Sequence, residues 1–382
     1  MDAAGARWKR VNKPYTVGVE EEVMLLEGGD LSFAQRSDEV IEALPPELTE
    51  HVSQETHAGV LELRTGVHLD VTGAVAELAR LRRQLCVELG SLGVRTACAG
   101  MHPLASARET RISAAARYRM IAEAMRCLAV REPTMALHVH VAVPDPDDAT
   151  RVLCRMRETV PLLVALSANS PFSQGRDTGF ASARTVTFDG FPRTGLPRAF
   201  ACYREYLEAI DPLIASGLLP DPTYLWWDVR LQPALGTVEV RVMDAQSTVA
   251  EIRPLVALVQ SLARLELTGH PEESRLSAEV LAENRFLAAR DGLGAHLIDP
   301  TTRGPAPIRR LLRKLVEDCR PHAAALGCSA ELQSVDRLIA VNGAIRQRAW
   351  VSGGQDLGEV LSRLARQFAA PLPPVDVMSA AA

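Results

Sequence analysis

The chain has 382 residues, of which 47% are hydrophobic and 23% are charged, so it is long enough to bury a sizeable core and too apolar to be disordered. Its formal net charge of -5 and its scattered arginines argue against a nucleic-acid or membrane partner and favour a small-molecule substrate. No stretch reaches the roughly 20 apolar residues of a membrane span, and the first residues lack the apolar core of a signal peptide, so we expect a cytoplasmic location.

Short segments of alternating polar and apolar residues recur between longer segments with helical spacing. The alternation predicts β-strands at residues 16–25, 59–65, 137–143, 225–231 and 237–244. Apolar residues at helical spacing predict helices within 70–90, 106–128, 147–166, 198–217, 249–268 and 306–348. We therefore expect a mixed fold of strands and helices.

Each predicted strand keeps one polar row, whereas strands of a parallel sheet that is buried on both faces are apolar throughout. This favours an α+β fold with a mainly antiparallel sheet, whose apolar face packs on helices and whose polar face lines a cavity. No repeat and no linker rich in Gly, Pro or Ser separates two domains. We expect a single domain over residues 1–370, helical from about 250, and a disordered tail at 371–382.

The polar rows of four predicted strands carry the candidate site. In the first strand, Glu20 and Glu22 share one face, while Glu21 falls on the valine face and is expected to pair with an arginine or lie at a sheet edge. The polar rows of the other three strands hold Glu62 with Arg64, His138 with His140, and Glu239 with Arg241.

Several carboxylates on one surface repel one another, and a divalent cation relieves that repulsion. Carboxylates with one or two imidazoles suit Mg²⁺, or Mn²⁺, that holds a nucleotide phosphate. Arg241 shares a row with Glu239 and is placed to contact a phosphoryl group that is being transferred. No P-loop, dinucleotide fingerprint, H-E-x-x-H or G-x-S-x-G motif is present, so any nucleotide must be held without a P-loop.

The sequence strings resemble those of a known family, the carboxylate-amine ligases called glutamate-cysteine ligase family 2. The matching strings include GVEEEVML, VLELRTGV, LHVHVAVPD, ALSANSPF and GTVEVRVMDAQ, and together the matches span residues 16–297. The resemblance implies a glutamine-synthetase-like fold, in which a curved antiparallel sheet forms a funnel for ATP and divalent metals. The metal ligands of the family fall on Glu20, Glu22, Glu62, His138 and Glu239.

The resemblance also implies a role for several further residues. Arg241 corresponds to the arginine that faces the transferred phosphate, which makes Arg241 and Glu239 the candidate catalytic residues. His140, Arg184 and Arg230 join Arg241 as candidates for binding ATP. Asn169, Ser170, Trp227 and Asp244 lie in matching strings without an assigned role.

The implied reaction joins a glutamate-like acid to cysteine or another amine through an acyl phosphate. Met101, Ala142, Leu231 and Gln232 depart from the usual family pattern and bear on which substrates fit. The sequence leaves open the two substrates and a homodimeric state.

Three alternatives remain at this point. One is an amine or guanidine kinase of the same fold, and another is a protein that holds nucleotide without turnover. The third is a metal-dependent hydrolase built on His138, His140 and carboxylates, which would need a further histidine, with His57 and His102 as candidates.

Overall fold

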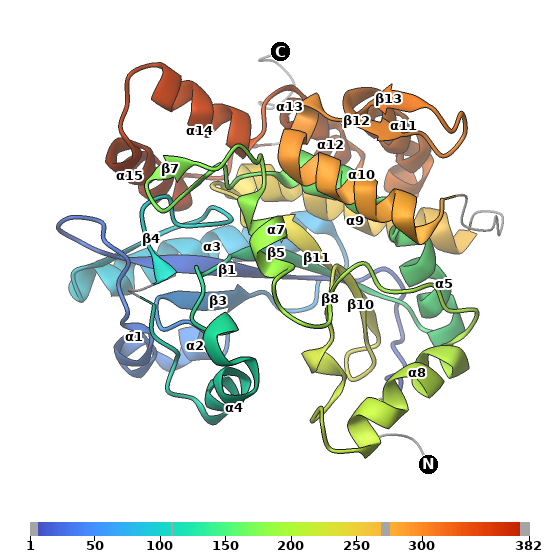
Figure 1. Cartoon of the computed structure of the whole chain (residues 1–382), viewed down its shortest axis with the longest axis horizontal. Helices are drawn as coiled ribbons and strands as arrows, with labels where there is room; N and C mark the ends of the chain where they lie inside the picture. Colours follow the sequence, from blue (N-terminus) through green and yellow to red (C-terminus); the bar gives the residue numbers. More distant parts are fainter. Residues whose placement is uncertain (1–6, 108–109, 269–275, 375–382) are drawn as a thin grey trace.

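A computed structural model describes residues 7–107, 110–268 and 276–374 of the protein (Figure 1). Within these residues, one seven-stranded sheet runs through the middle of the molecule, and all of its strand pairs are antiparallel. The strands lie in the order β10 (Val229–Gln232), β11 (Thr237–Asp244), β5 (Ala136–Ala142), β1 (Val17–Glu27), β3 (Val60–Arg64) and β2 (Val52–Gln54), and β4 (Val94–Ala97) also pairs with β1. The predicted α+β fold with a mainly antiparallel sheet is confirmed.

One predicted strand is divided in the structure. The segment 225–231 forms β9 (Trp226–Trp227), which pairs with β8 (Thr194–Gly195) in a separate parallel pair, and β10, which belongs to the main sheet. The break at Asp228 separates the two tryptophans of β9 from the main sheet, and Trp226 lines the cavity described below.

The strand register places the polar rows next to one another. Because β1 lies between β5 and β3, and β5 lies between β1 and β11, side chains from four strands meet on the same face. The cross-strand pairs on this face are Glu22 with Glu62, Glu20 with His138, Glu239 with His140, and Arg230 with Glu239.

A β-bulge interrupts β11 between Val240 and Met243. Val240 lies opposite Val139, and the pairing resumes at Met243, which lies opposite Leu137. Arg241 and Val242 fall between these two pairs. A bulge adds one residue and bends the strand. Arg241 therefore sits at the point where β11 leaves the regular sheet.

Four helices cover the apolar face of the sheet: α3 (Val71–Ser91), α5 (Pro146–Met156), α6 (Val160–Ser167) and α9 (Val249–Thr268). Asp70 begins α3 as an N-cap, because its Oδ1 accepts a hydrogen bond of 2.8 Å from the amide of Gly73. The predicted helix at 147–166 is two helices, since Pro161 cannot continue the hydrogen-bond ladder of α5.

The C-terminal helices gather on one side of the molecule in Figure 1, at the top, with α4 and α8 on the opposite side. The predicted stretch 306–348 is broken into four helices, and Gly327 ends the first of them with a φ of +74°. The C-terminal helices are α10 (Ala278–Asp291), α11 (Ile308–Leu326), α12 (Ser329–Gln333), α13 (Val335–Ala340), α14 (Gly343–Ser352) and α15 (Leu357–Phe368), of which α11 to α14 fall within the predicted stretch.

The remaining elements are short. Of the predicted helix at 106–128, only α4 (Ala116–Met125) and the 3₁₀ turn η2 (Arg126–Leu128) form, while 108 and 109 lie outside the described residues. The other elements are α1 (Ser37–Ala43), α2 (Pro46–Thr49), α7 (Ala183–Phe188), α8 (Tyr203–Ala215), η3 (Pro222–Tyr224), η4 (Gly292–Gly294), β6 (Phe172–Ser173), β7 (Arg176–Asp177), β12 (His296–Ile298) and β13 (Pro305–Pro307).

One cluster of buried apolar side chains extends along the chain from Trp8 to Phe368. The predicted single domain over 1–370 and the predicted tail at 371–382 stay predictions, and residues 375–382 of that tail lie outside the described residues. In the described part of the chain, no helix has the length and apolar character needed to cross a bilayer.

Candidate active site

A cavity of about 420 Å³ opens on the polar face of the sheet. Seven of the predicted site residues line it: Glu20, Glu22, Glu62, His138, Arg184, Arg230 and Arg241. The other two, His140 and Glu239, are buried beside the cavity and lie within 4 Å of side chains that line it. Five strands, β1, β3, β5, β10 and β11, together with α7 thus bring all nine predicted site residues to one place.

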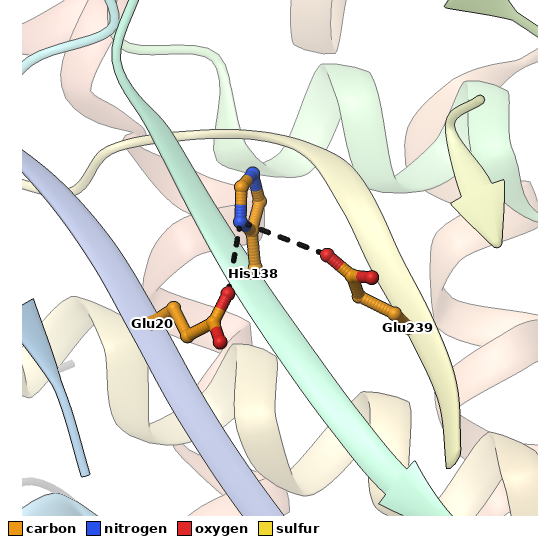
Figure 2. Close-up of side chains that lie close together, drawn as sticks. All are labelled: Glu20, His138 and Glu239. Carbon is orange, nitrogen blue, oxygen red and sulfur yellow. Dashed lines mark hydrogen bonds and ion pairs between the residues drawn. The ribbon is translucent and has the colours of Figure 1, made fainter. Parts of the chain in front are cut away.

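Glu20, His138 and Glu239 form a cluster whose geometry suits a metal ion (Figure 2). The Nδ1 atom of His138 lies 3.4 Å from Oε2 of Glu20 and 3.8 Å from Oε1 of Glu239. One potential ligand atom from each residue lies within 4.8 Å of the other two. Two carboxylates and an imidazole at this spacing can close around a single divalent cation.

A second group of acids, Glu22, Glu55 and Glu62, lines the same cavity next to Glu20. Burial raises the pKa of Glu62 well above its ordinary value, and the charges of Glu20, Glu55 and Glu22 raise it further. Burial also raises the pKa values of Glu22 and Glu55. This crowding is the repulsion that a cation with oxygen ligands relieves.

Glu55 was missed in the sequence analysis. It follows β2 in the turn toward β3, where no alternating pattern assigns its side chain to a face. Glu55 lines the cavity, and its Oε2 accepts a hydrogen bond of 2.9 Å from the amide of Thr56.

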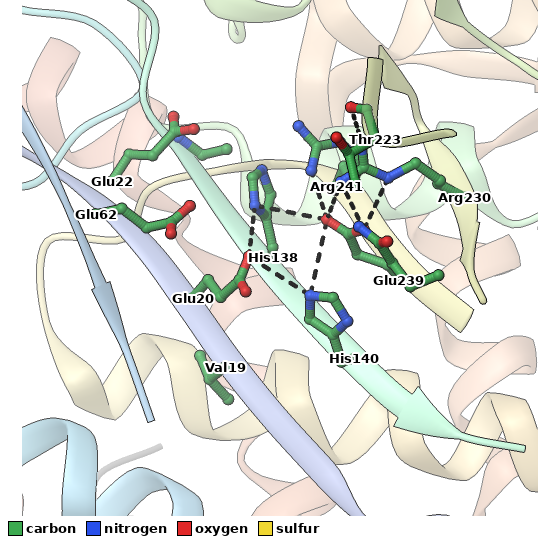
Figure 3. Close-up of polar contacts among 12 residues, drawn as sticks. Val19, Glu20, Glu22, Glu62, His138, His140, Thr223, Arg230, Glu239 and Arg241 are labelled. Carbon is green, nitrogen blue, oxygen red and sulfur yellow. Dashed lines mark hydrogen bonds and ion pairs between the residues drawn. The ribbon is translucent and has the colours of Figure 1, made fainter. Parts of the chain in front are cut away.

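Glu239 is fully buried and is surrounded by donors (Figure 3). Its carboxylate accepts hydrogen bonds from Arg230 and from Gln232 at 2.9 Å, and it forms an ion pair with Arg241. Burial alone would raise the pKa of Glu239, but the charges of Arg230 and Arg241 outweigh burial and hold the pKa far below its ordinary value. Glu239 is therefore an anion that holds the guanidinium groups of Arg230 and Arg241 at the cavity wall.

Arg184 supports the bulge of β11. Its two terminal nitrogens donate hydrogen bonds of 3.0 and 3.1 Å to the carbonyls of Val242 and Arg241. These carbonyls lie at the bulge, where β11 leaves its pairing with β5. Arg184 thus lines the cavity and at the same time fixes the backbone from which Arg241 projects.

Asp244 ties the end of β11 to two loops. Its carboxylate accepts hydrogen bonds of 2.7 to 2.8 Å from the amide of Asn169 and from the hydroxyls of Ser170 and Ser182. The residues of the ALSANSPF and VMDAQ strings therefore meet in a buried network that positions the loop before α7.

Glu21 lies behind the sheet, as expected from alternation. It forms an ion pair with Arg82 of α3, and the side chains of the two residues are 0% and 1% exposed. Arg82 also donates to the carbonyls of Gln246 and Ser247 at 2.9 and 3.1 Å. The predicted pairing of Glu21 with an arginine is confirmed.

Neither histidine proposed for a hydrolase centre joins the Glu20–His138–Glu239 cluster. His57 lines the cavity, but its Nε2 bonds the carbonyl of Ala129 at 2.9 Å, and burial lowers its pKa to about 4. The Nδ1 of His102 accepts hydrogen bonds from the amides of Leu104 and Ala105. Among the described residues, the further histidine that a zinc hydrolase would need is therefore not supplied by either candidate.

Comparison with known sequences gives one matching family model, described as glutamate-cysteine ligase family 2, over residues 16–366. A protein of Rubrobacter xylanophilus named "Putative glutamate--cysteine ligase 2-1" is 38% identical over 94% of this chain and 96% of its own length. A second protein of the same organism, "Putative glutamate--cysteine ligase 2-3", is 39% identical over 93% of this chain and 98% of its own length. A protein of Gloeobacter violaceus with the corresponding name is 37% identical over 91% of this chain and 95% of its own length.

Solved structures with little sequence similarity share the fold. The glutamate–cysteine ligase of Francisella tularensis in complex with AMP superposes with a TM-score of 0.67 at 12% identity, covering 97% of this chain and 92% of that one. A bifunctional glutathione synthetase from Pasteurella multocida superposes with a TM-score of 0.68 at 13% identity, covering 93% of this chain and 52% of that one.

Proposed function

The chain belongs to glutamate-cysteine ligase family 2, a family of ATP-dependent carboxylate-amine ligases, and we propose that its cavity joins a glutamate-like amino acid to cysteine or another amine. The observation that supports the cavity as the active site is the convergence of carboxylates, an imidazole and two arginines from five strands on one space of 420 Å³. Such a site can hold a polyanion and neutralise the charge that develops as it reacts.

The residues that would hold Mg²⁺, or Mn²⁺, are Glu20, Glu22, Glu62, His138 and Glu239. Their fit is supported by the spacing of the Glu20–His138–Glu239 cluster and by the crowding of the acids around Glu62. A divalent cation held by these residues would offset the negative charge that develops on the phosphoryl group in the transition state.

The arginines at the cavity wall act on the phosphates of ATP. Arg230 and Arg241 keep their charge next to Glu239, and the Nε of Arg241 is buried without a hydrogen-bond partner. We assign Arg241 to the phosphoryl group that is transferred, and His140, Arg184 and Arg230 to the binding of ATP.

The chemistry proceeds in two steps. A carboxylate oxygen of the acid attacks the γ-phosphorus of ATP, the bond to the bridging oxygen breaks, and ADP and an acyl phosphate form. The amine nitrogen then attacks the acyl carbon, phosphate leaves and the nitrogen loses a proton. Enclosure by the cavity keeps water from hydrolysing the acyl phosphate.

All seven cysteines are free thiols in the structure, which is in keeping with a reducing compartment such as the cytoplasm. The substrates are small molecules, and light scattering after size-exclusion chromatography tests the homodimer that the sequence left open.

The test is release of ADP from magnesium-ATP with amino acids supplied singly and in pairs. We expect an amide product only when an acid and an amine are both present, and we expect Glu20→Gln to lower turnover by about a hundredfold or more, because it removes a ligand charge. Glu27→Gln is the matched control, since Glu27 ends the same strand and pairs with Arg36 away from the cavity.

Two results would count against the proposal. One is the absence of ADP release with every acid and amine pair, and the other is equal turnover in the Glu20→Gln and Glu27→Gln variants. A phosphorylated amine as the product, without an amide, would instead indicate the kinase alternative.

A further inference from the structure

Arg285 of α10 is a buried arginine that has no part in the proposed reaction. Its side chain is 9% exposed and does not line the cavity. Its guanidinium donates hydrogen bonds of 2.6 and 3.0 Å to the carboxylate of Asp228, and of 2.6 and 2.9 Å to the carboxylate of Asp189. The planar fork of an arginine can bind two carboxylates at once, whereas the ammonium group of a lysine is a single point of charge. Arg285 therefore ties two separate segments of the chain to α10.

Asp228 connects Arg285 to the backbone of Arg241. Asp228 lies at the break between β9 and β10, and its side chain is 4% exposed. Its backbone carbonyl accepts a hydrogen bond of 2.8 Å from the amide of Arg241. The bulge takes Arg241 out of the regular pairing between β11 and β5. Asp228 therefore supplies the hydrogen-bond partner that holds the amide of Arg241.

Asp189 connects Arg285 to the carbonyl of the same residue through α7. Asp189 lies at the C-terminal end of α7, and α10 packs against this helix (Figure 1). Arg184, in the first turn of α7, donates hydrogen bonds to the carbonyls of Arg241 and Val242. The amide and the carbonyl of Arg241 are thus both held by segments that Arg285 ties to α10.

Charge repulsion makes this arrangement depend on Arg285. The carboxylates of Asp189 and Asp228 both accept a hydrogen bond from the Nη2 atom of Arg285, so they lie close together. Without the guanidinium, two negative charges would face each other, and that of Asp228 would be buried. This repulsion is relieved when α7 moves away from the break between β9 and β10. Such a movement pulls the two supports of Arg241 apart.

We propose that Arg285 is a positioning residue, which holds Arg241 at the cavity through Asp228 on one side and through Asp189 and α7 on the other. The inference rests on the proposed function, in which Arg241 contacts the phosphoryl group that is transferred. A displacement of about 1 Å at a reacting group can lower the rate by about a hundredfold. Loss of Arg285 should therefore lower kcat, while the KM for ATP should change little, because the binding contacts along the nucleotide remain.

The first test is the steady-state kinetics of ADP release by the full chain. We expect Arg285→Met to lower kcat by about thirtyfold or more and to change the KM for ATP by less than about threefold. Arg285→Lys keeps the cation but can reach only one carboxylate, so we expect it to recover part of the lost kcat. Arg155→Met is the matched control and should keep the wild-type kcat, since it removes a partly buried arginine of α5 that pairs with Glu266 of α9 behind the sheet.

Hydrogen–deuterium exchange tests the position of Arg241 without any measurement of activity. We expect the amide of Arg241 to exchange about tenfold faster or more in Arg285→Met than in the wild type, because its bond to Asp228 is loosened, while the amides of β5 exchange as in the wild type. Asp189→Ala removes a partly exposed carboxylate and only the tie to α7. We expect it to fold and to lower kcat by about threefold or more.

The proposal would be overturned by a wild-type kcat in Arg285→Met, by an equal loss of kcat in Arg285→Met and Arg155→Met, or by unchanged exchange at Arg241 in Arg285→Met. A wild-type kcat in Asp189→Ala would overturn it even if the variants of Arg285 do not fold. A wild-type protein that releases no ADP with any acid and amine would contradict only the proposed function, and the exchange at Arg241 would then decide whether Arg285 positions this residue.

Discussion

Glu21 and Glu22 are neighbours in the chain, yet their carboxylates lie on opposite faces of β1. Glu22 lines the cavity, and Glu21 is buried against Arg82 of α3. The two acids therefore contribute to different properties of the protein, one to ligand binding and the other to stability. Removing one partner of a charged pair that is buried this deeply strongly destabilises the fold, because the other charge stays buried without a counter-charge.

Glu21→Gln tests this division. We expect the free energy of unfolding to fall by about 3 kcal/mol or more, because Arg82 is left without its counter-charge, while Mn²⁺ affinity stays within about twofold, because no ligand is altered. Urea unfolding and calorimetry measure the two quantities. Glu27→Gln, which breaks a half-exposed pair on the same strand, should cost less than about 1 kcal/mol. An equal loss in both variants would contradict the structural role of Glu21.

His57 makes the stability depend on pH. Burial lowers its pKa from 6.5 to about 4, so the unfolded chain takes up the proton first as the pH falls. The contribution of neutral His57 to the free energy of unfolding is complete above pH 6.5 and is lost as the pH falls from 6.5 to about 4. The difference between the two pKa values corresponds to about 3 kcal/mol at most.

Removing this titration should flatten the acid side of the stability curve. His57→Gln cannot take up a proton, so its free energy of unfolding should fall less than that of the wild type between pH 6.5 and pH 4.5. Urea unfolding at several pH values measures the two slopes. Equal slopes would mean that His57 is not buried as a neutral side chain.

Strand alternation was sufficient to predict most single residues of the site. Glu20, Glu22, Glu62 and His138 all line the cavity because each is on the polar row of its strand. Glu55 could not be found in this way, since a turn residue has no alternating neighbours to assign its face. The tautomer and orientation of His140 depend on Thr237 of another strand, which no local pattern reveals.

At the scale of elements, the bulge in β11 is the feature that directs Arg241. The strand pairs regularly with β5 up to Val240 and resumes at Met243, and Arg184 of α7 binds the two carbonyls in between. Sequence alternation gave no sign of the bulge, because Val240, Arg241 and Val242 continue the alternation of apolar and polar residues without a break. The residue that binds the bulge, Arg184, comes from α7, a distant part of the sequence.

The Arg184→Met variant tests whether Arg184 supports the bulge of β11 or binds ATP directly. The change removes two hydrogen-bond donors from buried carbonyls, so we expect a loss of about 1–3 kcal/mol in the free energy of unfolding together with a lower kcat, because Arg241 is displaced. Arg184→Lys can serve one carbonyl and should be intermediate. A raised KM for ATP with unchanged stability and kcat would show that Arg184 acts on the nucleotide alone.

At the scale of the whole molecule, the order of the strands determines what the site can do. Glu20, Glu62 and His138 line the cavity and Glu239 is buried beside it. These residues are far apart in sequence, and the strand order β11-β5-β1-β3 brings them together. The strands and their polar faces could be predicted, because both follow from a repeat of two residues. The order of the strands could not, because it depends on the packing of distant helices such as α3 and α9.

The proposed reaction activates a carboxylic acid in the cavity as an acyl phosphate. An acid that supports ADP release, labelled with ¹⁸O in its carboxylate, tests it directly in a reaction with ATP and an amine. Attack of the carboxylate on the γ-phosphorus, followed by displacement by the amine, leaves one carboxylate oxygen in the released phosphate. Mass spectrometry should therefore find one ¹⁸O atom in each phosphate, and an amide product accompanied by unlabelled phosphate would contradict an acyl-phosphate intermediate.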